Sequence, residues 1–319
     1  MPLPSLPGWL PLILLSALFL GIYDFSKKHA VNGNRVMPCL FLGTLCGTLF
    51  LLALHLLRGD FQEMLLCSRE LWLLTLGKSA IVAGSWIAGY FALHDLPISL
   101  AAPIRASSPL WVTLGGILLF GERPTPFQAL GMAIVFLGYF LFSASGRREG
   151  FSLRSRGVWM IVAATLIGSA SALYDKWLFG PKALSPDQVQ FHFSLDLVAI
   201  LGVAWLLQRH LPFLREQQPF QWRWSIPAIG ILLILADFCF FHALHAPDTQ
   251  VGILAILRRS SVAVSFACGA WYFRERDIPR KLLALLLVVG GVIILSRKAN
   301  PPHPGASPPH ASQERLLQP

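Results

Sequence analysis

The sequence predicts an all-α integral membrane protein with ten transmembrane helices, arranged as two inverted repeats of five helices each. Composition gives the first indication: 55% of the residues are hydrophobic and only 13% are charged, whereas soluble domains carry about 25% charged residues. The apolar residues form continuous runs of about 20, the length that a helix needs to span a bilayer. One of these runs also recurs in the second half of the chain, which indicates a duplication.

The recurring segment carries arginine inside an apolar run. Residues 104–108 read Ile-Arg-Ala-Ser-Ser, and residues 257–261, which lie 153 positions later, read Leu-Arg-Arg-Ser-Ser. Further pairs keep the same spacing: Asp95 with Asp248, Glu122 with Glu275, and Gly138 with Gly291. An internal duplication explains this match most simply, and such repeats are typical of secondary transporters.

The order of the apolar runs places the ten spans along the chain. We predict them at residues 9–28, 36–57, 70–93, 98–121, 125–144, 157–178, 187–208, 222–245, 249–272 and 280–297. The first run lacks the positively charged start of a cleaved signal peptide, so we expect it to remain as the first span. It ends in Tyr23-Asp24, much as the sixth run ends in Tyr174-Asp175.

Two repeats, a linker and a tail follow from this order. The repeats are expected at residues 1–146 and 157–298, with a basic linker at 147–156 and a disordered tail at 299–319, which is rich in Pro, Ser and His. Because five is an odd number, the second repeat enters the membrane from the opposite side. Connectors after odd-numbered spans carry 14 Lys and Arg residues against eight on the other face, which places both termini outside the cytoplasm by the positive-inside rule.

Two arginines within predicted spans are candidate substrate ligands. A charge near the bilayer centre costs about 2.5–3.5 kcal/mol on insertion scales, so it usually faces a partner or a polar cavity. Arg105 and Arg258 are each followed three residues later by a serine, Ser108 and Ser261, which predicts a shared helical face. Guanidinium groups suit carboxylates and phosphates, so the two arginines can clamp an anion. The structural alternative pairs each arginine with a carboxylate or a helix C-terminus.

A lysine and two aromatic residues form a second candidate group in the third span. Lys78 lies about a third of the way along this span, on the same helical face as Trp86 and close to Tyr90. An ammonium beside aromatic rings can orient a substrate. Alternatively, the lysine extends its ammonium to the nearby membrane interface.

Four aspartates and one histidine are candidates for coupling or gating: Asp24, Asp175, Asp196, Asp237 and His192. Asp24 and Asp175 end matching spans, which predicts a place at the rim of the site; the alternative is a solvated charge at a helix end. Asp237, and Asp196 with His192 one turn before it, lie inside spans, where a carboxylate without a nearby cation can bind and release a proton. Permanent pairing with Arg258 would remove that role.

Composition and motifs exclude several functions. The net charge is +10, but the basic residues lie in short connectors between apolar runs and form no nucleic-acid motif, so we expect no nucleic-acid partner. We find no phosphate-binding loop, hydrolase motif or metal-ligand spacing, and we therefore expect neither enzyme activity, nor a metal, nor a cofactor.

A turn motif at the end of the fourth and ninth spans adds a family resemblance. Residues 121–124 read Gly-Glu-Arg-Pro and precede a span with Gly131 and Gly138, whereas residues 274–277 read Arg-Glu-Arg-Asp and depart from the usual motif at their first and last positions. In these features the chain resembles the EamA-type ten-helix transporters of the drug/metabolite transporter superfamily. The resemblance implies inverted five-helix repeats, a central cavity, alternating access and cytoplasmic termini. The last point opposes the charge count, so orientation stays open.

These observations predict a multi-pass secondary transporter in the cell membrane, such as the inner or plasma membrane of a bacterium. Its substrate would be a small polar metabolite, anionic or zwitterionic, such as an amino acid or organic acid, with a proton as the candidate coupling ion. We expect a monomer or homodimer in the lipid bilayer. Two alternatives stay open: an exporter of cationic drugs or metabolites, and a non-transporting, lipid-handling membrane protein.

Overall fold

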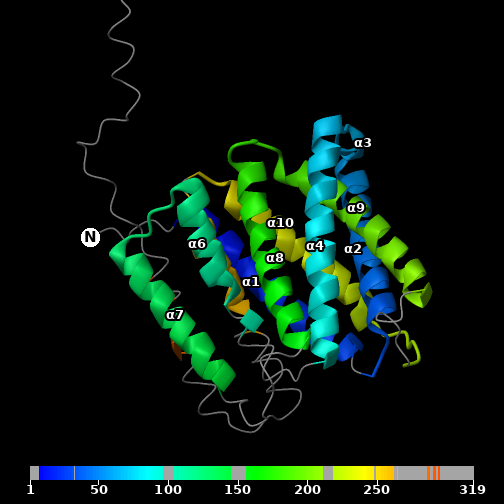
Figure 1. Cartoon of the computed structure of the whole chain (residues 1–319). Coiled ribbons are helices and arrows are strands. Elements are labelled where there is room, and N and C mark those ends of the chain that lie inside the picture. Colours follow the sequence, from blue (N-terminus) through cyan, green and yellow to red (C-terminus); the bar gives the residue numbers. More distant parts are fainter. Residues whose placement is uncertain are drawn as a thin grey trace, which may run out of the picture.

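The computed structural model describes residues 7–31, 33–95, 104–105, 107–144, 156–210, 218–247 and 249–261, with isolated residues up to 294. Every regular element in these ranges is a helix, and the long helices run side by side in one bundle (Figure 1). The elements are α1 (Trp9–Val31), α2 (Val36–Arg58), α3 (Phe61–Leu65), α4 (Arg69–Asp95), α6 (Ser108–Phe120), α7 (Pro126–Ala144), α8 (Arg156–Phe179), α9 (Pro186–Leu207), η1 (Gln208–His210), α10 (Ser225–His245) and α11 (Val251–Arg259).

Six of these helices, α1, α2, α4, α8, α9 and α10, are long and apolar enough to cross a bilayer. Helix α6 is apolar but shorter. Large apolar side chains, such as Leu57 and Trp224, are exposed on the outside of the bundle, as lipid contact allows and water does not. The described residues therefore form a multi-pass membrane protein. Seven of the ten predicted spans coincide with observed helices to within a few residues. The tenth span is described only at isolated residues, which are helical, whereas most of the ninth span beyond Ser261, the linker before residue 156 and the tail lie outside the described residues.

The predicted continuity of the fourth span is wrong. Helix α6 begins at Ser108, after a turn at Ser107, so Arg105 and Ser108 do not share one uninterrupted helix. The hydroxyl of Ser107 donates to the carbonyl of Ile104 at 2.6 Å, and its amide donates to the same oxygen at 3.1 Å. These bonds offer the backbone a turn in place of helix.

The second copy of the motif has the same local structure. The hydroxyl of Ser260 donates to the carbonyl of Leu257 at 2.6 Å, its amide donates there at 3.1 Å, and α11 ends at this turn. Two segments that lie 153 residues apart therefore make identical backbone contacts. The similarity extends from sequence to conformation.

Helix pairs from the two halves of the chain hold the bundle together. The most extensive contacts join α1 to α10 and α4 to α8, followed by α2 with α10 and α4 with α9. Serines bridge the first two pairs: Ser16 donates to the carbonyl of Ala236 at 2.7 Å, and Ser85 to that of Ala164 at 2.8 Å. Such side-chain bonds are a usual means of helix association in membranes.

Candidate functional site

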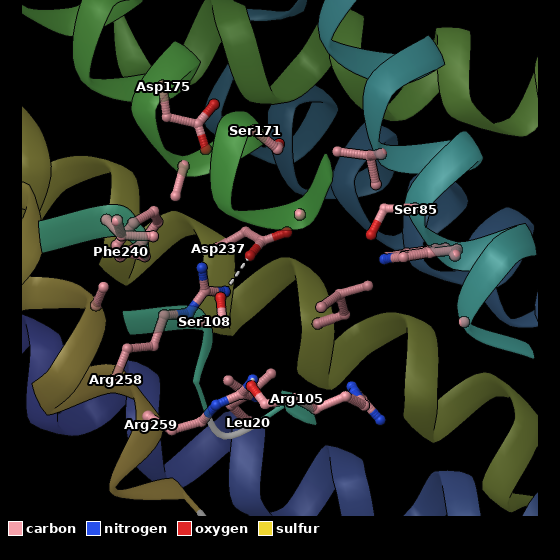
Figure 2. Close-up of a pocket in the computed structure, with 18 of the residues that line it drawn as sticks. Leu20, Ser85, Arg105, Ser108, Ser171, Asp175, Asp237, Phe240, Arg258 and Arg259 are labelled. Carbon is pink, nitrogen blue, oxygen red and sulfur yellow. Dashed lines mark hydrogen bonds and ion pairs between the residues drawn. The ribbon is translucent and has the colours of Figure 1, made fainter. Parts of the chain in front are cut away.

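A cavity of about 320 Å³ lies inside the bundle, between α1, α4, α6, α8, α10 and α11 (Figure 2). Its wall carries five cationic and three carboxylate side chains, an excess of two positive charges. The cations are Lys27, Lys78, Arg105, Arg258 and Arg259, and the carboxylates are Asp24, Asp175 and Asp237. The cavity thus collects most of the predicted site residues from both halves of the chain.

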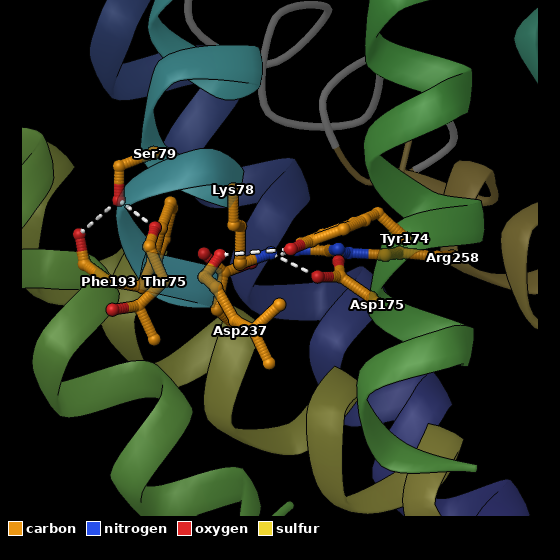
Figure 3. A network of polar contacts seen from close by, with 9 residues as sticks. Thr75, Lys78, Ser79, Tyr174, Asp175, Phe193, Asp237 and Arg258 are labelled. Carbon is orange, nitrogen blue, oxygen red and sulfur yellow. Dashed lines mark hydrogen bonds and ion pairs between the residues drawn. The ribbon is translucent and has the colours of Figure 1, made fainter. Parts of the chain in front are cut away.

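One buried ion pair joins α4 to α8 at the inner end of this cavity. The Lys78 ammonium donates to the Asp175 carboxylate, and the two side chains are only 2% and 6% exposed (Figure 3). The ammonium also lies over the rings of Phe193 and Phe241, at 4.5 Å and 4.7 Å from their centroids. Lys78 is therefore held in the interior and does not extend to the membrane interface.

A second ion pair joins α10 to α11 close to the first. The Arg258 guanidinium donates to the Asp237 carboxylate, and its Cζ atom lies 4.2 Å from the ring centroid of Phe240 (Figures 2 and 3). The Nε atom of Arg258 is buried, and no described residue accepts a hydrogen bond from it. A buried donor without an acceptor is costly, so this N–H adds to the cost of placing Arg258 here.

The other end of the cavity carries charges without ion pairs. Arg105 and Asp24 line the wall there, and neither side chain forms a hydrogen bond or ion pair with the residues that the structure describes. The backbone carbonyl of Arg105 accepts a bond of 2.8 Å from the Arg259 guanidinium. Ser108 lines the same region and lies 3.0 Å from the hydroxyl of Ser169 on α8. Here the N-terminus of α6 faces the cavity, and helix N-termini favour anions.

Several predicted site residues lie elsewhere. Ser261 is fully buried and does not line the cavity, whereas Trp86 does. Asp196 accepts a bond of 3.0 Å from Thr75, and both Asp196 and His192 lie on α9, outside the cavity wall. The backbone of Tyr90 belongs to α4, but its side chain lies outside the described part.

Contacts between α4 and the end of α8 close the bundle beyond the inner ion pairs. The Tyr174 hydroxyl donates to the carbonyl of Leu74 at 3.2 Å, and the Lys182 ammonium donates to Glu70 at 2.6 Å. The Lys176 ammonium reaches the Thr249 carbonyl on the loop before α11.

Glu122 connects the two halves at the same end of the bundle. The structure places this carboxylate at the N-terminus of α11, and not at that of α7, the helix that follows it in the chain. It accepts bonds from the amides of Val251 and Gly252 at 2.6 Å and 3.4 Å. Burial raises the pKa of Glu122, and the two amides and the nearby Lys176 charge only partly oppose this shift.

Sequence reasoning missed the phenylalanines of the site, Phe193, Phe240 and Phe241. An apolar ring in an apolar span gives no signal of its own. The pairing of Lys78 with Asp175 was also missed, because the two residues lie 97 positions apart. Only the recurrence of Tyr-Asp at 174–175 marked one of the partners.

Comparisons with known proteins agree with this architecture. Residues 7–144 match the model of the EamA-like transporter family, which confirms the predicted resemblance over the range of the first predicted repeat. A solved structure described only as "Crystal structure of protein" is similar, with a TM-score of 0.73 and 18% identity over 91% of this chain and 99% of that chain. At this identity the similarity shows the fold alone. No curated protein matches the chain. The family match points to a membrane transporter.

Proposed function

We propose that this protein is a secondary transporter that moves a small anionic or zwitterionic metabolite by alternating access. The observation that carries the proposal is the excess of two positive charges on the wall of a cavity inside a membrane protein. Arg105 on this wall has no carboxylate partner among the described residues, and a charge inside a membrane protein is costly without one, so an anionic ligand gains free energy when it enters. A volume of about 320 Å³ is at the lower end of ordinary ligand sites, which favours a small metabolite.

Arg105 is the residue that we expect to contact the anion first. It lines the cavity without an ion pair among the described residues, so a carboxylate can bind it without displacing a protein carboxylate. The N-terminus of α6, beside Ser108, adds a second favourable element, because interrupted helices that point their positive ends at substrate anions are a recurrent device of transporters.

The arrangement of the helices supports alternating access. If α1 corresponds to α8 and α4 to α10, the two most extensive contacts, α1 with α10 and α4 with α8, are copies of each other. The inverted repeat that we propose relates them by a two-fold axis in the membrane. The cavity extends towards one end of the bundle, whereas contacts such as that of Glu122 with Val251 hold the other end closed. Rocking about the axis would exchange the two ends.

Proton coupling, in this proposal, is assigned to Asp196 with His192. Asp237 is bound to Arg258 and so already has a cationic partner. Asp196 has a hydroxyl as its partner, with His192 one turn away on the same helix. The pair lies outside the cavity, so coupling would act through the movement of α9.

The test is ligand stabilisation of the purified protein, followed by uptake into liposomes. Carboxylic acids, amino acids and phosphorylated compounds should raise the melting temperature, and Arg105→Ala should abolish the rise. Lys182→Ala is the matched control, because it removes an exposed cation far from the cavity. Stabilisation by organic cations alone would overturn the proposal. It would favour the second candidate function, export of cations, for which the unpaired Asp24 on the cavity wall is the supporting observation.

A further inference from the structure

The inner end of the cavity contains a complete set of groups for binding a cation. Two phenylalanine rings, Phe193 and Phe241, lie within 4.7 Å of one ammonium nitrogen, and the Asp175 carboxylate accepts a hydrogen bond from it. Aromatic faces combined with a carboxylate are the chemistry by which proteins recognise alkylammonium ions. Here the bound ammonium is the protein's own Lys78.

The three groups come from different helices and meet only at this point. Asp175 lies on α8 and Phe193 on α9, whereas Phe241 lies on α10. All of them line the cavity together with Lys78, so a free ligand could reach them from the cavity if the lysine side chain were absent. Lys78 is among the largest fully buried side chains of the described residues, and its removal would leave a channel shaped like a butyl chain that ends at the carboxylate.

We propose that Asp175, Phe193 and Phe241 form a binding site for alkylammonium groups, and that Lys78 occupies this site and thereby excludes organic cations from the cavity. The lysine acts as a tethered ligand whose local concentration no free cation can match. With the cation site filled, Arg105 remains on the wall without a carboxylate partner among the described residues, and the cavity favours anions. Lys78 is therefore a specificity-determining residue of the transporter proposed above, and this inference rests on that function.

The arrangement explains why a buried lysine is tolerated here. Removing one partner of a buried pair leaves the other as an uncompensated charge, which is strongly destabilising. In Lys78→Ala the orphan is Asp175, whose side chain is only 6% exposed, and an alkylammonium ion that fills the vacated space between the two phenylalanine rings would be bound tightly by it. The same substitution thus creates both a defect and a ligand site.

Chemical rescue tests the inference. Lys78→Ala should gain thermal stability as butylammonium chloride is added, whereas sodium chloride at equal ionic strength should have no such effect. The double variant Lys78→Ala/Asp175→Asn retains the vacated space without the carboxylate, and it should show no response to butylammonium. The wild-type protein should show none either. If Lys78→Ala cannot be purified alone, butylammonium during extraction should recover folded protein, and sodium should not.

Each outcome is decisive. A Lys78→Ala protein that butylammonium neither stabilises nor recovers would overturn the inference, as would a wild-type protein that binds butylammonium equally well. Anion stabilisation of the wild type is measured in the same series. If anions bind the wild type but butylammonium leaves Lys78→Ala unchanged, the proposed function stands and only the cation site fails. If butylammonium rescues Lys78→Ala but anions leave the wild type unchanged, the cation site stands and the anion assignment fails.

Discussion

The closest helix crossing in the bundle gives a prediction whose size can be worked out from distances. Helices α2 and α10 meet at glycines, and a Cβ atom on Gly230 would lie 1.9 Å from the carbonyl oxygen of Gly43 and 2.5 Å from the amide nitrogen of Gly47. Real Cβ atoms keep at least 3.0 Å from such neighbours. The obstructing atoms belong to the backbone, so no side chain can rotate away, and Gly230→Ala must separate the two helices by at least 1.1 Å.

We expect this separation to cost stability and to disturb the cavity. Overpacking a close-packed interface costs about 1–3 kcal/mol, and the rigid neighbours place Gly230→Ala at the upper end of this range. Asp237, two turns further along α10, lines the cavity and binds Arg258, so a displaced α10 should also weaken anion binding.

The assay is thermal or denaturant unfolding of the purified variants, combined with anion titration. Gly84→Ala is the matched control, because Gly84 also lies inside a long helix but a Cβ there would meet no atom within 4 Å. Removing that glycine should leave stability unchanged or raise it by up to about 1 kcal/mol. If Gly230→Ala unfolds at the wild-type temperature, or behaves like Gly84→Ala, the close crossing does not exist in solution.

Three further predictions concern charged groups. Because burial raises the pKa of Glu122, the folded state binds the proton of this carboxyl group more tightly than the unfolded state does. The contribution of Glu122 to stability is therefore complete below the unfolded-state pKa and is lost as pH rises through the folded-state pKa. Glu122→Gln should flatten the fall of melting temperature from about pH 4 to about pH 7. Glu70→Gln should change the free energy of unfolding by less than about 1 kcal/mol, because its ion pair with Lys182 is exposed. A larger loss would mean that this ion pair is needed to hold α4 and α8 together at the closed end of the bundle. Asp196→Asn should remove the dependence of liposome uptake on a pH gradient, while anions should still stabilise the detergent-purified protein. If uptake by this variant still depends on the pH gradient, Asp196 does not couple transport to protons.

The fold could be predicted from the sequence where a segment must be helical to cross the bilayer. A continuous apolar run must be helical to satisfy its backbone in lipid, so spans such as 36–57 and 157–178 match α2 and α8 within one residue at each end. The turn at Ser107 could not be predicted in this way. The span was drawn from its apolar length alone, whereas Pro109 in the first turn of α6, a residue typical of helix starts, and the bond from the Ser107 hydroxyl to the Ile104 carbonyl mark the interruption.

The candidate site was predicted residue by residue but not as an arrangement. Periodicity fixes which residues share a face of one helix, but it does not fix how that helix is rotated against its neighbours. Lys78 and Asp175 were therefore both singled out and yet assigned to separate roles, and the ring of Phe241 that lies beside them was not noticed.

The duplication itself predicts equal roles for equivalent residues, and the structure shows why this step of the reasoning fails. The second copies, Asp175 and Arg258, are neutralised by Lys78 and Asp237 at the inner end of the cavity. Their first copies, Asp24 and Arg105, line the cavity with no such partner among the described residues.

The reason lies in the helices that supply the partners. At the spacing of 153 residues, Lys78 corresponds to Ile231 and Asp237 to Gly84, so neither partner was kept in both halves. Segments with similar sequence and local structure thus lie in two different electrostatic environments: the inner end of the cavity is neutral and its outer end is charged. Under the proposed function, a ligand bound at the outer end contacts Arg105 and Asp24 and not the paired charges. Substitutions at these two first copies should therefore change which ligands bind, whereas substitutions at the second copies should first reduce the amount of folded protein.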